Sequence, residues 1–349
     1  MDTKILKIIE DNIDENLINE AVDKIKSGGL VAFPTETVYG LGANGFDESA
    51  AKKIFIAKGR PQDNPLILHV SSIDQVEELV MKIPEVAKKC MEKFWPGPLT
   101  ILLKKSDKVS SIITAGLNTV AIRMPENKIA LELIKKSNIP IAAPSANTSG
   151  RPSPTSAKHV IEDLNGKVDI IIDGGNAGIG LESTVLDLSG EIPMILRPGG
   201  ITKEDLIKII PNIEVDFAII KEDENIVPKS PGQKYRHYAP KSEMIVYNGE
   251  VRNIVETISV KTKEYISNGK IVGIICTDET KEFYKEGIVI SMGSRKDKKT
   301  IAHNLFNTLR LFDEENVDII LGEGVDFSFL GTAIMNRMMK ASGGKIIEV

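Results

Sequence analysis

After about residue 243 the sequence alternates between short apolar runs and longer segments whose apolar residues recur at helical spacing. The apolar runs predict strands over 243–248, 271–276, 287–292, 317–321 and 345–349. The intervening segments predict helices over about 251–267, 278–284, 298–313 and 329–341. Strands that are joined through helices run parallel, and the helices cover the faces of the sheet. The pattern therefore predicts a small Rossmann-like, doubly wound α/β sheet for this part of the chain.

The first two hundred residues mix strands and helices less regularly. Strands are expected over 30–33, 65–70, 99–103, 119–123, 139–143, 168–173, 183–188 and 194–197. Helices are expected over 14–27, 47–58, 72–82, 84–94, 127–136, 156–163 and 202–210. This irregular order favours an α/β fold with α+β character, an open twisted sheet with helices, over strict alternation.

A change in composition separates the two parts. Residues 221–225 form a charged break, and prolines and a glycine follow between 228 and 240, which is typical of an interdomain linker. The segment 234–238 nevertheless carries more functional groups than a spacer requires. We expect domains at 1–212 and 242–349, joined by a linker at 213–241, and 349 residues are enough for two domains.

Charge and cysteine content exclude several classes of protein. A formal net charge of −5 argues against general coating of nucleic acid but leaves room for a local basic pocket. Cys90 and Cys276 lie in apolar contexts and are expected to be packing residues in a reducing compartment; two cysteines and four histidines do not supply a zinc site. No apolar run reaches the roughly 20 residues of a membrane span, and the first residues do not resemble a signal peptide. A cytoplasmic protein without membrane contact is the expectation.

The stretch from Phe33 to Gly42 is the first candidate for a binding site. It follows the buried run Leu30–Phe33 and contains the hydroxyls of Thr35, Thr37 and Tyr39. A core strand does not need these groups, since each buried hydroxyl has to find a partner. A strand that ends at a small-molecule site does need them.

Lys58 and Arg60 form a second candidate. They stand at the end of the helix expected over 47–58, where Gly59 is suited to end a helix and Pro61 favours an extended Arg60. Both cations would then project from a rigid corner and could neutralise a polyphosphate. A Lys-Gly-Arg at a helix end, taken alone, is more often solvated.

Other polar groups also follow apolar strands, and each has a structural alternative. The run Pro144–Gly150 could form an anion-binding nest or a polar turn. Arg123 could hold a carboxylate or pair with a structural acid, and His69 alone is more often a core histidine than a catalytic one. Arg197 could contact phosphate or mark a strand exit.

Several familiar catalytic signatures are missing from the sequence. It contains no P-loop motif, no Gly-x-Ser-x-Gly elbow and no metal-ligand spacing of histidines and carboxylates. The glycine-rich segment 174–180 lacks the spacing of a dinucleotide-binding loop, and its favoured interpretation is a connection between strands.

In combination these motifs are far more specific. Lys58-x-Arg60 and Ser145-x-Asn147, together with residues 33–41, resemble the YrdC/Sua5 family of threonylcarbamoyl-AMP synthases. Further matching segments lie at 95–100, 182–185, 230–232, 235–240 and 330–337. Because the resemblance spans essentially the whole chain, it is closer to the two-domain Sua5 type than to the single-domain type.

The resemblance implies an enzyme that forms an adenylate. Members combine L-threonine, bicarbonate or CO2, and ATP into L-threonylcarbamoyladenylate and pyrophosphate. Mg²⁺ accompanies ATP and is held through the phosphates rather than by protein ligands. The product serves a threonylcarbamoyl transferase complex that makes N6-threonylcarbamoyladenosine (t6A) at adenosine 37 of certain tRNAs. The nucleophile is the substrate's own carbamate, which explains the missing catalytic signatures.

The resemblance also implies roles for individual residues. The threonine contacts would be Thr37, His69, Arg123, Ala143 and Ser183. The nucleotide contacts would be Lys58, Arg60, Asn64, Thr119, Ser145, Asn147, Ser153, Arg197 and Tyr235, with Lys58 and Arg60 also acting in catalysis. The family often has lysine where Asn64 stands, which leaves the role of that side chain open. In the family the linker folds back over the pocket, so Tyr235 and its neighbours would close the site against water.

Three alternatives remain at this stage. The first is a binding module of YrdC type that takes double-stranded RNA on a local basic face, and a weak RNA contact is also compatible with the enzyme. The second is a carbamoyltransferase of the hydrogenase-maturation type, which shares the Lys-x-Arg and Ser-x-Asn pattern but requires zinc-finger cysteines that two cysteines cannot supply. The third is a noncatalytic regulator, against which the intact motifs argue.

Overall fold

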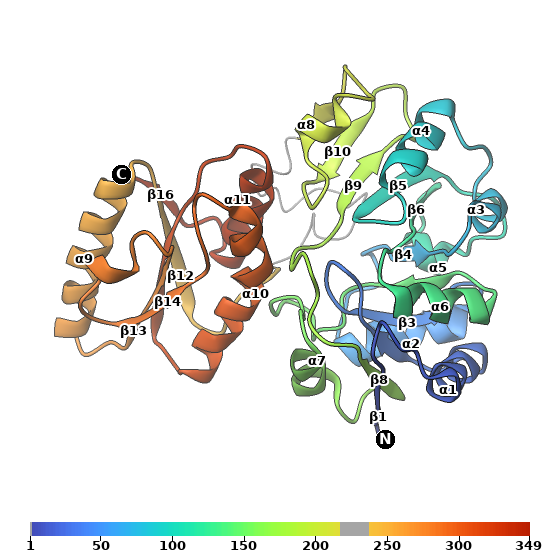
Figure 1. Ribbon diagram of the computed structural model, residues 1–349, viewed down its shortest axis with the longest axis horizontal. Coiled ribbons are helices and arrows are strands. Elements are labelled where there is room, and N and C mark those ends of the chain that lie inside the picture. Colours follow the sequence, from blue (N-terminus) through green and yellow to red (C-terminus); the bar gives the residue numbers. More distant parts are fainter. Residues whose placement is uncertain (1, 217–236) are drawn as a thin grey trace. The chain divides into compact units, whose positions relative to one another are not determined.

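A computed structural model describes residues 2–216 and 237–349 (Figure 1). Within these ranges the chain forms two compact units. The first contains residues up to 149, 153–178 and 182–216, and the second contains 150–152, 179–181 and 237–349. Most of the linker expected at 213–241 lies outside the described residues, so its boundaries stay predictions.

The first unit is built on one large mixed sheet. Its order is β1-β8-β2-β3-β7-β4-β6-β5-β9-β10-β11. The strands are β1 (Lys4–Lys7), β2 (Val31–Phe33), β3 (Gly40–Asn44), β4 (Ile67–His69), β5 (Leu99–Lys104), β6 (Thr119–Arg123), β7 (Ile141–Ala143), β8 (Ile170–Asp173), β9 (Thr184–Asp187), β10 (Met194–Arg197) and β11 (Glu214–Val215). The sheet contains both parallel pairs such as β4–β6 and antiparallel pairs such as β5–β6, which confirms the α/β fold with α+β character.

Helices cover both faces of this sheet because its strands alternate apolar residues between the two faces. The helices are α1 (Glu15–Lys26), α2 (Glu48–Lys58), α3 (Ile73–Leu79), α4 (Glu85–Phe94), α5 (Ser111–Thr114), α6 (Lys128–Ser137), α7 (Ala157–Leu164) and α8 (Lys203–Leu206). Helices α1 and α6 pack with Val31 and Phe33 of β2. Helices α2, α3, α4 and α7 pack on the other face, with Leu30 and Ala32. The helices expected over 72–82 and 202–210 are shorter in the structure.

The strand β3 was not expected from the sequence. Gly40 and Gly42 pair with Phe33 and Val31 of β2. A Cβ atom on Gly42 would lie 2.8 Å from the Phe33 ring and 2.8 Å from Ile141, so the neighbouring side chains require glycine there. Glycine at alternate positions weakens a strand pattern, which is why the sequence indicated a loop although Leu41 and Ala43 are apolar.

The second unit has a five-stranded parallel sheet in the order β14-β13-β15-β12-β16. Its elements are β12 (Glu243–Asn248), α9 (Val251–Ser267), β13 (Val272–Cys276), a short 3-10 helix (Lys281–Phe283), β14 (Ile288–Ser291), α10 (Lys298–Glu314), β15 (Ile319–Glu323), α11 (Leu330–Ala341) and β16 (Ile346–Glu348). Helix α9 covers one face, and α10 and α11 cover the other (Figure 1). The Rossmann-like prediction is confirmed, although the helix expected over 278–284 is only the 3-10 turn.

Candidate active site

Four predicted site residues of the first unit, His69, Thr119, Arg123 and Ala143, lie along one face of the central strands β4, β6 and β7. Residues in register on neighbouring strands point to the same face. His69 is in register with Arg123, and Arg123 with Thr100. Ile67, two residues before His69, is in register with Ala121 and Ala143. The predicted threonine contacts on β4, β6 and β7 therefore share one surface.

An apolar cluster forms the middle of this face. Ile67, Leu102, Ala121, Val185 and Leu196 pack together there. Arg123 ends β6 beyond this cluster, while Thr119 begins the same strand on its other side. The two residues are four positions apart, about 13 Å along a strand. The face thus has two polar ends, the Arg123 end and the Thr119 end.

At the Arg123 end, three side chains from two distant segments meet. The guanidinium of Arg123 donates through Nη1 to Thr37 Oγ1 at 2.8 Å and through Nη2 to Glu36 Oε1 at 2.6 Å. The side chains of Arg123 and Glu36 are 5% and 10% exposed, so this ion pair is shielded from water. Thr35 Oγ1 lies 2.9 Å from Thr37 Oγ1 and orders the turn before β3. The hydroxyls that marked this stretch in the sequence therefore have partners at a candidate site.

Glu36 is a site residue that sequence reasoning missed. Its Oε1 accepts from Arg123, while its Oε2 is buried and has no hydrogen-bond partner among the described residues. A buried carboxylate oxygen without a donor is costly, because the group loses water without a replacement. The only available signal was the presence of an acid between Thr35 and Thr37 in the hydroxyl-rich stretch.

His69 is held as a neutral side chain. It is buried, its Nδ1 lies 3.2 Å from the Ile67 carbonyl, and its ring meets Phe33 edge-on at 6.0 Å. Burial, followed by the adjacent charge of Arg123, lowers the pKa of His69 to about 3. A neutral imidazole beside Arg123 can orient a ligand by hydrogen bonding but does not add a second positive charge.

Ser183 and Arg197 complete the Arg123 end. Ser183 Oγ lies 2.8 Å from Thr100 Oγ1, and Thr100 is in register with Arg123. Arg197 donates from Nη2 to Ser183 Oγ at 3.1 Å and from Nε to the Ser183 carbonyl at 3.0 Å. The structure thus brings Arg197, a predicted nucleotide contact, next to the predicted threonine contact Ser183.

Lys58 clamps the loop that carries the Ser-x-Asn motif. Gly59 ends α2 with a φ of 62°, as expected for a glycine in this position. The Lys58 ammonium donates to the carbonyl of Ser145 at 2.6 Å, to the carbonyl of Asn147 and, at 3.3 Å, to Asn147 Oδ1. Ser145 Oγ also donates to Asn147 Oδ1 at 2.5 Å. Lys58, Ser145 and Asn147 therefore form one cluster, in which Lys58 and Asn147 are buried and the cation supports the loop.

The opening stretch and this loop are directly joined. Leu41 N donates to the Pro144 carbonyl at 2.9 Å, and Ala146 N donates to the Tyr39 carbonyl at 2.8 Å. Tyr39 uses its hydroxyl to donate to the Gly175 carbonyl, which fixes the glycine-rich segment as a structural loop. Burial raises the pKa of this phenol, so it stays protonated.

Arg60 and Asn64 lie together at the nucleotide side. Arg60 Nη2 donates to the carbonyls of Asn64 at 3.3 Å and Pro65 at 3.1 Å, which shapes the turn before β4. Asn64 Oδ1 is a buried acceptor without a partner among the described residues. Since β4 and β6 are parallel with Ile67 opposite Ala121, Pro65 is level with Thr119. Arg60, Asn64 and Thr119 thus mark the other end of the face.

Two further predicted contacts have different outcomes. Ser153 is buried, and its hydroxyl donates to Glu182 Oε1. Tyr235 lies outside the described residues.

Among the described residues no group of three or more His, Cys, Asp or Glu side chains is arranged to hold a metal ion. The same residues contain no helix that is long and apolar enough to cross a membrane. Cys90 and Cys276 are both buried and unpaired in disulfides, as expected for packing residues.

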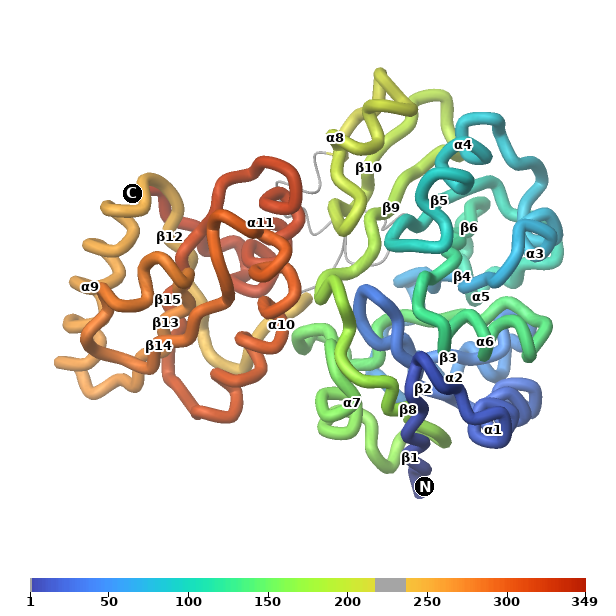
Figure 2. Tube along the Cα trace, viewed as in Figure 1, coloured from blue at the N-terminus to red at the C-terminus, as the bar shows by residue number. Residues whose placement is uncertain are grey.

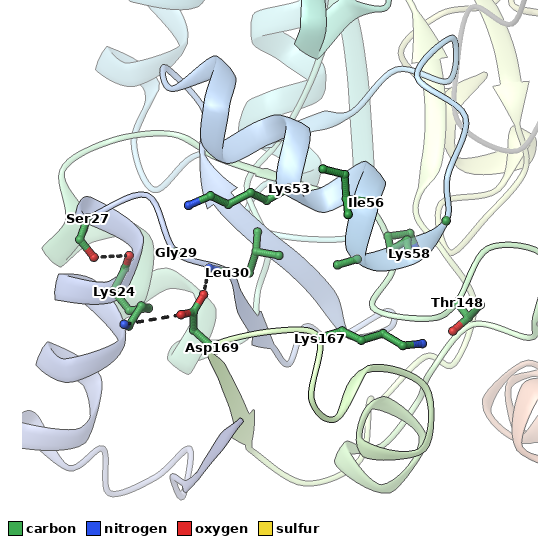
Figure 3. A pocket seen from close by; sticks show the side chains of 12 residues that line it. Lys24, Ser27, Gly29, Leu30, Lys53, Ile56, Lys58, Thr148, Lys167 and Asp169 are labelled. Atoms are coloured by element: carbon green, nitrogen blue, oxygen red, sulfur yellow. Dashed lines mark hydrogen bonds and ion pairs between the residues drawn. The ribbon is translucent and has the colours of Figure 1, made fainter. Parts of the chain in front are cut away.

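A separate pocket lies beside α2 (Figure 3). It has a volume of about 780 Å³ and is lined by Leu30, Ile56 and several lysines. Its lysine ammonium groups already have partners: Lys24 reaches Asp169, and Lys53 donates to the Gly28 carbonyl. None of the predicted threonine contacts lines this pocket, whereas Lys58 and Gly59 do, so the pocket borders the Lys58 cluster and is distinct from the Arg123 end.

Comparisons with known proteins agree with this arrangement. A family model of Sua5, YciO and YrdC proteins, described as "Telomere recombination", matches residues 23–199. A second model, described as "Threonylcarbamoyl-AMP synthase, C-terminal domain", matches residues 201–343.

Full-length relatives are similar over both units. The chain is 51% identical over 344 residues to the threonylcarbamoyl-AMP synthase of Pyrococcus abyssi, covering 98% of each chain. It is 50% identical to that of Bacillus subtilis, covering 95% of this chain and 94% of the relative. The crystal structure of P. abyssi Sua5 complexed with L-threonine matches with a TM-score of 0.95 at 50% identity, covering 99% of this chain and 100% of the other. The chain therefore belongs to the Sua5/YrdC family, in its two-domain form, whose similar full-length members are threonylcarbamoyl-AMP synthases.

Proposed function

We propose that this chain synthesises L-threonylcarbamoyladenylate from L-threonine, bicarbonate or CO2, and ATP, and so supplies the t6A modification of tRNA. The observation that supports this most directly is the Arg123–Glu36 pair beside Thr37, at one end of a face whose other end carries Arg60. The identity of about 50% to named synthases supports the same activity.

The Arg123–Glu36 pair has the charge pattern that an amino acid zwitterion requires. The guanidinium binds the carboxylate of threonine, and the free Oε2 of Glu36 accepts from its ammonium group. Thr37 and Ser183 offer hydroxyls to the remaining polar atoms, and neutral His69 packs beside Arg123. Ala143 and the apolar cluster offer apolar surface on the same face to the threonine methyl group.

The chemistry needs no protein nucleophile. The threonine ammonium loses a proton, and the amine forms a bond to the carbon of CO2 with loss of a second proton, which gives a carbamate. A carbamate oxygen then attacks the α-phosphorus of ATP, the bond from that phosphorus to the bridging oxygen breaks, and pyrophosphate leaves. Glu36 is placed to accept the first proton, because its Oε2 has no competing donor among the described residues.

The chain's contribution to the second step is alignment and neutralisation of charge. Arg60 and Arg197 neutralise the phosphates, Lys58 holds the Ser145–Asn147 loop in place, and Asn64, Thr119 and Ser153 contact the nucleotide. Mg²⁺ enters as part of the ATP substrate, held by phosphate oxygens and water. The adenylate then passes to a threonylcarbamoyl transferase complex.

The test is release of pyrophosphate from ATP with threonine and bicarbonate each omitted in turn. We expect release only when both are present, together with a product of the mass of threonylcarbamoyladenylate. Pyrophosphate release that ignores threonine would overturn the proposal. Salt-dependent binding of double-stranded RNA without any pyrophosphate release would favour the binding-module alternative instead.

A further inference from the structure

The second unit has a crevice at the carboxyl edge of its parallel sheet. Strands β12 and β15 are neighbours, and their outgoing connections lead to opposite sides (Figure 2). After β12 the chain passes through α9 to β13, and after β15 it passes through α11 to β16 on the far side of β12. This is a topological switch point, where open α/β sheets bind ligands just beyond the strand ends. A position in the fold does not by itself make a binding site, so the case for a ligand has to come from the side chains around this crevice.

A pocket with a volume of about 360 Å³ occupies this position. That volume lies within the range of small-ligand sites. The lining comes from the ends of β12 and β15 and from the start of α9 and α10. Its residues are Asn248, Gly249, Val251, Arg295, Lys298, Gly324, Val325 and Asp326. Two valines and three charged side chains thus converge at one point of the sheet edge.

Arg295 presents a fixed guanidinium to this pocket. Its Nη2 donates to Glu323 Oε2 at 2.8 Å, and its Nε donates to Thr277 Oγ1 at 3.0 Å. Glu323 is fully buried and is also bound by the Tyr284 hydroxyl at 2.6 Å. The Nη1 group of Arg295 has no protein partner among the described residues, and the side chain keeps 18% exposure. An arginine held on one edge and open on the other is suited to an anionic oxygen, above all a phosphate.

Asp326 supplies an acceptor to the same pocket. Its Oδ1 accepts from Lys298 Nζ at 2.5 Å and from Ser328 N at 3.0 Å, which fixes the loop after β15. Its Oδ2 has no partner in the described part of the chain, and the side chain is 67% exposed. A fixed carboxylate at the edge of a doubly wound sheet is suited to bind vicinal hydroxyls such as those of a ribose.

Two exposed aromatic rings stand next to this carboxylate in the chain. Phe327 is 55% exposed and Phe329 is 60% exposed. Phe329 also has a φ of 50°, a value that bulky residues rarely adopt. Exposed phenylalanines beside polar groups for phosphate and hydroxyl are typical of surfaces on which a base stacks.

We propose that this pocket is a second nucleotide site, separate from the catalytic face of the first unit. Arg295 binds the phosphate, Asp326 binds the ribose hydroxyls, and Phe327 or Phe329 stacks on the base. The nucleotide is either free or part of a single-stranded RNA, since both present the same phosphate, ribose and base.

The experiment counts nucleotides bound to the full-length chain by equilibrium dialysis with labelled AMP and, in a second arm, with a single-stranded ribo-oligonucleotide. Val251→Trp fills the pocket from a position that is 41% exposed, so the core is untouched. Arg295→Lys keeps the charge beside Glu323 but removes the open Nη1 edge. Arg252→Lys is the matched control, because Arg252 is on the same helix as Val251 and is 86% exposed outside the pocket.

Both pocket variants are expected to bind one AMP fewer per chain than wild type and the Arg252→Lys control. If instead AMP binding is equal in all four proteins but the oligonucleotide binds roughly ten-fold or more weakly to both pocket variants, the pocket binds a nucleotide of single-stranded RNA rather than a free nucleotide. Unchanged binding of both probes in folded Val251→Trp would overturn the proposal. The experiment compares nucleotide binding among proteins that differ only in the second unit. Its result therefore does not depend on whether the first unit releases pyrophosphate.

Discussion

Replacing Glu36 by glutamine tests the proposed threonine end most sharply. The change keeps the size of the side chain and an oxygen that can accept from Arg123 Nη2, now 2.6 Å from Glu36 Oε1. It replaces the partnerless Oε2 with an NH₂ group that can only donate. The ammonium of threonine would then meet a donor instead of an acceptor.

We expect two effects of this substitution, one on the KM for threonine and one on stability. A lost hydrogen bond to a charged group is worth about 1.5–3 kcal/mol, which corresponds to roughly a 10- to 150-fold increase in the KM for threonine. The same change leaves the Arg123 charge, which is 5% exposed, without its counter-charge. Breaking a buried ion pair typically lowers the free energy of unfolding by roughly 3–5 kcal/mol. Because the amide oxygen still accepts from Arg123, we expect the lower value, about 3 kcal/mol. For a unit of this size that lowers the Tm by roughly 6–12 °C.

The assay is pyrophosphate release at saturating ATP and bicarbonate, with threonine varied, below the lowered Tm. The KM for ATP should change little, because the carboxylate of Glu36 pairs with Arg123 and, being an acceptor, makes no bond to phosphate oxygens. Glu20→Gln is the control: its ion pair with Lys4 is exposed, so threonine kinetics should stay at the wild-type value. A folded Glu36→Gln protein with an unchanged KM for threonine would refute the assignment of Oε2 to the substrate's amino group.

Three further predictions concern the same unit and the two thiols. Arg60→Ala and Lys58→Ala should each nearly abolish pyrophosphate formation, and Lys58→Ala should also lower the Tm because its ammonium supports the Ser-x-Asn loop; full turnover in both variants would remove them from the site. Because the pKa of His69 is lowered to about 3 by burial and then by Arg123, its contribution to stability is complete above the unfolded pKa of about 6.5 and declines as the pH falls from there towards 3. Chemical denaturation should therefore show about 2 kcal/mol less stability at pH 5 than at pH 8 from this residue, a difference that His69→Asn should lack. Burial raises the pKa of Cys90 to about 11 and that of Cys276 to about 12, so iodoacetamide at pH 8 should label neither thiol until the protein unfolds; rapid labelling of the folded chain would contradict their burial.

Periodic patterns predicted most of the fold. The strands and helices after residue 243 lie within a few residues of their predicted positions because each buried strand is a continuous apolar run between amphipathic helices. The strand β3 was not predicted. It needs Gly40 and Gly42 because a side chain at either position would crowd the Phe33 ring, and that contact is visible only in three dimensions. The short 3-10 turn at Lys281–Phe283 has no buried residue and so no apolar face to hold a longer helix.

The candidate site was less accessible from sequence patterns. Arg123 and Glu36 are separated by 87 positions, and no local spacing predicts that they form a buried pair. For that reason the sequence left open whether Arg123 binds a substrate carboxylate or pairs with an acid of the protein. The structure shows that it pairs with Glu36, and this pairing is compatible with substrate binding. The ammonium of Lys58 donates to the loop of Ser145 and Asn147, which pairs with β3 at Gly40, and no local spacing predicts that contact. Its role at the phosphates stays a prediction.

The central claim is that one face of the first sheet joins threonine, a one-carbon unit and the α-phosphate of ATP. The most direct measurement is the mass of the product formed from ¹³C-bicarbonate, threonine and ATP, quenched early. We predict an adenylate that contains threonine and is one mass unit heavier than the product from unlabelled bicarbonate, formed in step with pyrophosphate. Pyrophosphate release with a product that lacks either the label or threonine would contradict the claim.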